Sequence, residues 1–138
     1  MEENAQKNDD VYAFIFGVSN VGKSTILYKY LGKEAPTNKT VGVDLQIKEL
    51  KGNSFFKIRD CSGQERFRDT AKMHCGNSDG AFIVYDITDK NSFEIIGEFA
   101  NMFRAKTSQT SPIIILGNKT DLKDQRTVSY DEGKNSNL

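Results

Sequence analysis

The sequence predicts an α/β fold, with a mostly parallel β-sheet, one antiparallel hairpin strand and helices on both faces. Short, continuous apolar runs, typical of strands buried on both faces, recur along the chain. Segments with apolar residues at helical spacing lie between them, and this alternation indicates a parallel sheet covered on both sides. The 138 residues fit one domain, which we expect at residues 11–138 after a disordered polar arm at residues 1–10.

The first half of the chain supplies a strand, a helix and a hairpin. Val11–Phe16 is a continuous apolar run and Lys23–Leu31 contains no helix breaker, so we expect a strand followed by a helix. Apolar and polar residues alternate over 43–48, which predicts a half-buried strand. Turn residues at 51–53 and an apolar segment at 55–60 complete an antiparallel hairpin.

The second half continues the alternation of strands and helices. Residues 61–79 are polar and punctuated by glycine, so we expect a mobile segment. Residues 80–85 and 112–116 are apolar runs that predict two further strands, and residues 91–105 show the apolar spacing of a helix. Ligands of such folds bind at the carboxyl ends of the strands, where the motifs described below are found.

A glycine-rich loop lies between the first strand and the first helix. Residues 17–24, Gly-Val-Ser-Asn-Val-Gly-Lys-Ser, fit the pattern G-x-x-x-x-G-K-[ST]. In such a loop, backbone N–H groups and a helix N-terminus surround a polyphosphate, and the crowding favours glycine. Lys23 adds a positive charge for the phosphates, and the Ser24 hydroxyl is a hard ligand for Mg²⁺. The predicted nucleotide-binding residues of the loop are Gly17, Ser19, Asn20, Val21, Gly22, Lys23, Ser24 and Thr25.

A second motif, Asn118-Lys119-Thr120-Asp121, follows the last predicted strand. The Asp121 carboxylate can accept two hydrogen bonds from the ring N–H and the exocyclic amine of guanine, which adenine does not offer in that geometry. Asn118 can bond a base acceptor and tie loops together, while the stem of Lys119 can cover the face of the base. We therefore predict that Asn118, Lys119 and Asp121 bind guanine.

Three further residues fit the chemistry at a terminal phosphate. Asp60 can hold a water on Mg²⁺, and Gly63 can offer its backbone N–H to the phosphate. The carboxamide of Gln64 can orient a water that attacks the phosphate. Thr40 can supply a second hydroxyl to the metal, so the predicted metal ligands are Ser24, Thr40 and Asp60.

Taken together, these segments resemble a small GTPase of the Ras superfamily, most of all its Rab branch. The resemblance spans residues 11–133 and rests on five ordered motifs, at residues 17–24, 40–44, 60–68, 80–86 and 117–122. It implies a small G domain of the P-loop NTPase fold that binds GTP and GDP with Mg²⁺ and hydrolyses GTP slowly. It also implies a switch in vesicle and membrane traffic. Its exchange factor, GTPase-activating protein and effectors would contact residues 32–50 and 59–76.

The sequence also departs from this family. The chain ends soon after residues 128–133, which look like the start of a family helix, so we expect a truncated G domain that lacks the last strand and helix. The first switch is short and an aromatic partner for guanine has no match, so we expect weaker nucleotide binding. Two alternatives stay open: a non-catalytic GTP/GDP binder that acts as a decoy or partner-binding module, and a fragment of a longer protein.

The composition and the two ends of the sequence argue against several other kinds of function. The 19 basic and 19 acidic residues balance, which argues against general attraction to nucleic acid. The chain shows no secretory signal, and its C-terminus has no cysteine for prenylation, so we expect a cytoplasmic protein without a direct lipid anchor. Cys61 and Cys75 lack metal-ligand spacing and are expected to be free thiols.

Overall fold

The computed structural model describes residues 9–34, 43–61 and 63–136. Its strands are β1 (Val11–Phe16), β2 (Val43–Glu49), β3 (Phe55–Cys61), β4 (Gly80–Asp86) and β5 (Ile113–Asn118). Its helices are α1 (Lys23–Leu31), α2 (Arg68–His74), α3 (Lys90–Glu94), α4 (Ile96–Lys106) and α5 (Tyr130–Lys134). Two short 3-10 helices cover Glu65–Phe67 and Lys123–Gln125. None of the helices described is both long and apolar enough to cross a membrane.

The strands form a single twisted sheet in the order β2-β3-β1-β4-β5. Strand β1 pairs in parallel with β3 and β4, and β4 pairs in parallel with β5. Among the strands described, the β2–β3 hairpin alone is antiparallel, with Val43 opposite Cys61 and Glu49 opposite Phe55. The predicted α/β class, with one antiparallel hairpin strand, is therefore confirmed.

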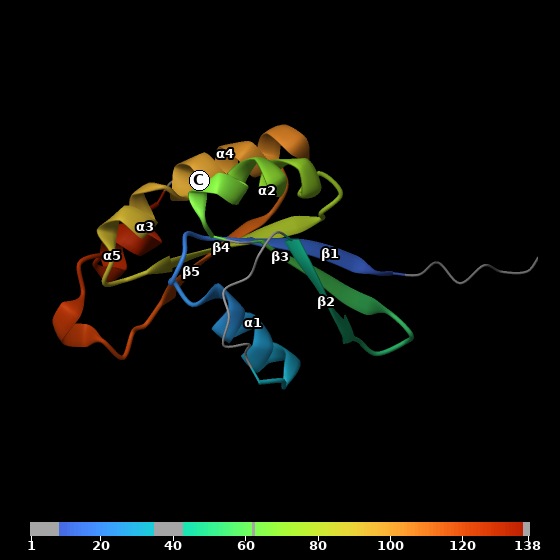
Figure 1. Ribbon diagram of the computed structural model, residues 1–138, viewed down its shortest axis with the longest axis horizontal. Coiled ribbons are helices and arrows are strands. Elements are labelled where there is room, and N and C mark those ends of the chain that lie inside the picture. The colour runs from blue at the N-terminus through green and yellow to red at the C-terminus, as the bar shows by residue number, and fades with distance from the viewer. Residues whose placement is uncertain (1–8, 35–42, 62, 137–138) are drawn as a thin grey trace, which may run out of the picture.

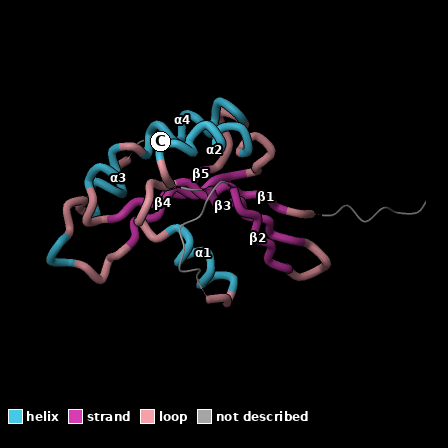
Figure 2. The backbone as a smooth tube through the Cα atoms, viewed as in Figure 1, coloured by secondary structure: helices cyan, strands magenta, loops and turns pink. Residues whose placement is uncertain are grey.

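Helices cover both faces of the sheet, as predicted. Helix α1 lies on one face, while α2, α3 and α4 lie on the other (Figures 1 and 2). The alternation of side chains along β1 explains this division, because Phe14 and Phe16 pack in the larger core and Ile15 packs in the smaller one. The larger core contains Phe99, Ala100 and Phe103 of α4, and the smaller core contains Leu27 of α1.

The prediction of a mobile segment over residues 61–79 missed regular structure. The segment contains the 3-10 helix Glu65–Phe67 and helix α2, and Ala71 and Cys75 are buried in the larger core. Arg68 forms an ion pair with Glu98 of α4, with 3.6 Å between Nη1 and Oε2. Two small apolar residues spaced by four positions were the available signal, but the polar majority of the segment obscured it.

Two other expectations need correction. The predicted helix over residues 91–105 is divided at Ile95 into α3 and α4, although its apolar residues do face the core. The alternation in β2 predicted a half-buried strand, but Leu45 and Ile47 are 46% and 48% exposed. Both lie on β2, the outer strand of the sheet, where Val43 packs against the larger core and Leu45 and Ile47 lie farther along the strand.

Candidate nucleotide-binding site

The glycine-rich loop leaves the buried end of β1 and enters α1 at Lys23. The Lys23 side chain is 8% exposed, and its Nζ donates to the carbonyl of Gly17 at 2.9 Å and to that of Val18 at 3.4 Å. Burial lowers the pKa of Lys23, and the nearby carboxylate of Asp60 offsets part of this shift. The loop thus holds its ammonium group inside the turn, where an anion would meet both the charge and the helix N-terminus.

The predicted metal ligands that the structure describes lie together. Ser24 Oγ donates to Asp60 Oδ2 at 3.0 Å, and Asp60, next to the end of strand β3, is 2% exposed. A hydroxyl and a carboxylate are the hard oxygen groups that suit Mg²⁺, so this donor set fits the ion. Thr40, the third predicted ligand, lies outside the described residues. The part of the chain that is described contains no group of three His, Cys, Asp or Glu side chains that could hold a metal.

The two predicted binding motifs meet although about a hundred residues separate them. Asn118 Nδ2 donates to the carbonyl of Val21 at 2.8 Å, and Lys119 Nζ donates to the carbonyl of Asn20 at 2.7 Å. A Cβ atom on Gly22 would lie 2.3 Å from Asn118 Nδ2, and Gly22 has a φ of 94°. Only glycine fits this position without strain, since it has no Cβ and tolerates positive φ.

The other predicted nucleotide-binding residues near this junction differ in how far they are buried. Gly63 packs against the glycine-rich loop, because a Cβ there would lie 2.5 Å from the backbone N of Ser19. Ser19 is half-buried, whereas the side chains of Thr25 and Asp121 are exposed. Because the Asp121 side chain is exposed, its carboxylate is accessible to the guanine base of a nucleotide.

Gln64, the predicted catalytic residue, is half-buried at the start of the 3-10 helix Glu65–Phe67. Its Oε1 accepts a hydrogen bond from Arg66 Nε at 2.8 Å. The Gln64 carboxamide is therefore held by Arg66, a close neighbour in the sequence.

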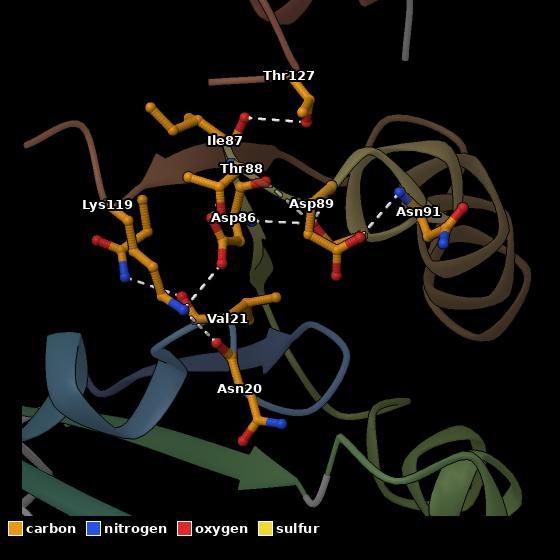
Figure 3. A network of polar contacts seen from close by, with 11 residues as sticks. Asn20, Val21, Asp86, Ile87, Thr88, Asp89, Asn91, Lys119 and Thr127 are labelled. Atoms are coloured by element: carbon orange, nitrogen blue, oxygen red, sulfur yellow. Dashed lines mark hydrogen bonds and ion pairs between the residues drawn. The ribbon is translucent and has the colours of Figure 1, made fainter. Parts of the chain in front are cut away.

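Asp86 is a site residue that the sequence reasoning did not assign. It ends β4 and is 6% exposed, and its Oδ2 lies 2.8 Å from Lys119 Nζ (Figure 3). Burial by itself raises the pKa of Asp86, but the hydrogen bonds from Lys119 and Thr88 outweigh burial and bring the pKa below its ordinary value. The available signal was a carboxylate at the carboxyl end of a buried strand, where ligands of such folds bind.

A phosphate loop after the first strand of such a sheet, joined to an Asn-Lys-x-Asp loop after the last, defines the class of small G domains. The chain belongs to the Ras family, whose sequence profile matches residues 13–137. It is 38% identical over 125 residues to the Ras-related protein Rab-11B of Dictyostelium discoideum and 39% identical over 126 residues to the GTP-binding protein YPT1 of Saccharomyces cerevisiae. The predicted likeness to the Rab branch is confirmed.

The relatives are longer than this chain. Each of these two alignments covers 87% of the chain, but 57% of the Dictyostelium protein and 61% of the yeast protein. A third relative, the Ras and EF-hand domain-containing protein homolog of Mus musculus, is 36% identical over 132 residues, which are 90% of the chain and 21% of that protein. The chain therefore spans about three fifths of the length of the two Rab-type relatives.

Proposed function

We propose that the chain binds GTP and GDP with Mg²⁺, hydrolyses GTP and acts as a Rab-type switch in membrane traffic. The observation that carries this proposal is the junction between the two motifs. Asn118 and Lys119 each donate a hydrogen bond to the glycine-rich loop, which brings the guanine motif beside the phosphate loop. Membership of the Ras family supports the same activity.

Each residue has a defined task in this proposal. Lys23 would give up its bonds to the loop carbonyls and bind phosphate oxygens instead. Ser24 and Asp60 would hold the metal. Mg²⁺, when bound, neutralises charge on the phosphates. Gln64 orients a water for attack on the terminal phosphorus, and the bond from that phosphorus to the bridging oxygen of GDP breaks.

Base selection can be tested by changing the carboxylate that reads guanine. Asp121→Asn replaces an acceptor by a donor, so the variant should lose affinity for GDP and gain affinity for xanthosine diphosphate, whose ring carries a carbonyl in place of the amine. Isothermal titration of both chains with both nucleotides measures the change. Unchanged GDP affinity in the variant, or tighter binding of ADP than of GDP by the unaltered chain, would contradict the proposal.

Hydrolysis is tested separately from binding. Single-turnover release of phosphate from bound GTP should be slow in the unaltered chain, and slower still in Gln64→Leu because leucine cannot orient water. Equal rates near zero in the two chains, with GTP still bound, would favour the alternative of a non-catalytic binder that acts as a decoy.

The switch is expected to involve the two segments proposed to contact regulators and effectors, residues 32–50 and 59–76. Exposed apolar side chains in these segments support a partner surface there, namely Leu45, Ile47 and Met73, the last 78% exposed. Amide hydrogen exchange of the chain loaded with GDP or with a non-hydrolysable GTP analogue should differ in these segments and agree in α4. Equal exchange in the two states would rule out a switch.

A further inference from the structure

We propose that Asp86 is a positioning residue of the nucleotide site: its carboxylate holds Lys119 against the phosphate loop and thereby slows release of the nucleotide. This inference rests on the proposed function. It concerns a residue outside the nucleotide-binding and metal sets predicted from the sequence. Asp86 reaches the site through Lys119 and does not itself belong to the phosphate or guanine motif.

One ammonium group joins the end of β4 to the phosphate loop. Lys119 Nζ lies 2.8 Å from Asp86 Oδ2 and donates to the carbonyl of Asn20 at 2.7 Å (Figure 3). Asn20 and Lys119 both have left-handed backbone conformations, with φ of 68° and 66°. Such conformations persist in non-glycine residues when the surrounding contacts hold them, and here the two strained residues hold one another.

Asp86 is itself fixed by its surroundings. Its Oδ1 accepts from the backbone N of Thr88 at 2.8 Å and from Thr88 Oγ1 at 2.6 Å, which leaves Oδ2 for Lys119. The buried hydroxyl of Ser92 donates to the carbonyl of Asp86, and the backbone N of Asp86 donates to that hydroxyl at 3.0 Å. The carboxylate is therefore a rigid anchor for the flexible lysine.

The sheet sets the distance between this anchor and the guanine motif. Asp86 pairs with Asn118 in the β4–β5 ladder, and the backbone N of Ile87 donates to the carbonyl of Asn118 at 3.1 Å. Lys119 follows Asn118 directly, so its side chain starts beside the Asp86 carboxylate. The low pKa of Asp86 is consistent with a charged carboxylate at neutral pH.

Removing the negative charge of Asp86 should change the rate at which nucleotide is released. In Asp86→Asn the amide can still bond Thr88, but Lys119 loses its ionic partner and gains freedom to leave the carbonyl of Asn20. The phosphate loop then opens more readily, so bound nucleotide should leave about tenfold faster, which is the order of effect of a charge-assisted hydrogen bond. The association rate should change less, since the site keeps its phosphate-binding groups.

The experiment measures release of a fluorescent GDP, mant-GDP, from the unaltered chain and from Asp86→Asn. Asp89→Asn is the matched control, because it removes the same charge three residues away. Asp89 faces Asn91, whose backbone N donates to its Oδ1 at 3.1 Å, and lies away from Lys119 (Figure 3). Asparagine also caps helices well, so the control should fold and should release mant-GDP at the rate of the unaltered chain.

A double-mutant cycle distinguishes positioning from a general structural role. Lys119→Met removes the ammonium group and keeps the aliphatic stem. In that background, Asp86→Asn should change the release rate by less than about twofold, because the partner is already gone. An equal acceleration in both backgrounds would show that Asp86 acts through the Thr88 turn and would overturn the inference.

Other outcomes separate this inference from the function on which it rests. Equal release from the unaltered chain and Asp86→Asn would overturn the positioning role and leave the proposed function intact. If the unaltered chain binds no mant-GDP, both the positioning role of Asp86 and the proposed function are wrong. Should Asp86→Asn not fold, Asp86→Ser removes the same charge with a hydroxyl that can still accept from Thr88, and the same acceleration is expected.

Discussion

At the residue scale, the site depends on backbone conformations that few side chains tolerate. Gly22, Asn20 and Lys119 all have positive φ, and all three lie at the junction between the phosphate loop and the guanine motif. For the non-glycine residues Asn20 and Lys119, such a conformation costs of order 1–3 kcal/mol, which the surrounding contacts must offset. Gly22 adopts it without this cost, but a residue with a side chain would not. Substitutions at this junction should therefore change stability and nucleotide binding together.

Gly22→Ala tests this coupling. The new methyl group would lie 2.3 Å from Asn118 Nδ2, so Asn118 must give up its bond to Val21. We expect GDP binding to weaken by about five- to tenfold, since a hydrogen bond is typically worth about 1–1.5 kcal/mol. Gly32→Ala is the control, because Gly32 has a similar φ of 70° but no atom within 4 Å of its Cβ position. Equal GDP affinity in the two variants would contradict the expected clash.

The lowered pKa of Asp86 implies that the stability of the fold depends on pH. The folded-state pKa of Asp86 lies below its ordinary value of 3.8. The carboxylate therefore stabilises the fold fully above the ordinary pKa, and this contribution is lost as pH falls through the folded-state pKa. Urea unfolding should show a constant difference between the unaltered chain and Asp86→Asn from pH 7 down to about pH 5, and a smaller difference below about pH 4. A difference that grows on acidification would contradict the sign of the shift.

At the element scale, α4 is the helix whose buried face agrees best with the sequence pattern. Its apolar residues recur at helical spacing, and Phe99, Ala100 and Phe103 are buried against the sheet. The 3.6-residue period alone identified this face, because it depends on local geometry. The break at Ile95 was not predicted. There ψ is −6°, and the backbone N of Glu98 donates to the carbonyl of Ile95, three residues earlier, at 3.1 Å.

Phe103→Ala should destabilise the domain by about 3–5 kcal/mol, the usual cost of deleting a buried aromatic ring. Phe103 is fully buried, and its ring centroid lies 5.9 Å from that of Phe16 in β1. Asn101→Ala is the control on the exposed side of α4 and should change the free energy of unfolding by no more than about 0.5 kcal/mol. A similar loss in both variants, measured by urea unfolding, would show that α4 contributes through helix formation rather than through its buried face.

At the scale of the whole molecule, the two faces of the sheet are covered unequally. On the α1 side, an apolar groove of about 350 Å³ runs between α1 and the sheet, and a smaller hollow of about 170 Å³ includes Ile114. Strand β5 pairs only with β4 among the strands described, and Ile114 is 53% exposed. An apolar edge strand without charged side chains favours association with other chains.

Ile114→Lys should therefore reduce self-association of the chain. A lysine on an edge strand disfavours pairing with a second strand, because its charge would have to be desolvated. Sedimentation velocity at increasing concentration should show monomer persisting to higher concentration in the variant. Gln109→Lys, which adds the same charge at an exposed position before β5, should leave association unchanged. An equal effect of both substitutions would attribute the change to net charge instead of the edge.

The sequence by itself determined the strands of the sheet, helix α1 and the motif residues. The bounds of β1 and α1 follow from a continuous apolar run and from glycines at both ends of the helix, which are local properties of the backbone. Only the tertiary structure decided which residues meet. The register of β4 with β5 places Asp86 beside Lys119, and Ala71 of α2 is buried in a core that joins α4 to the sheet. Such contacts join residues distant in sequence, so no local pattern encodes them. This is also why β2, alternating like a half-buried strand, exposes Leu45 and Ile47 at the outer strand of the sheet.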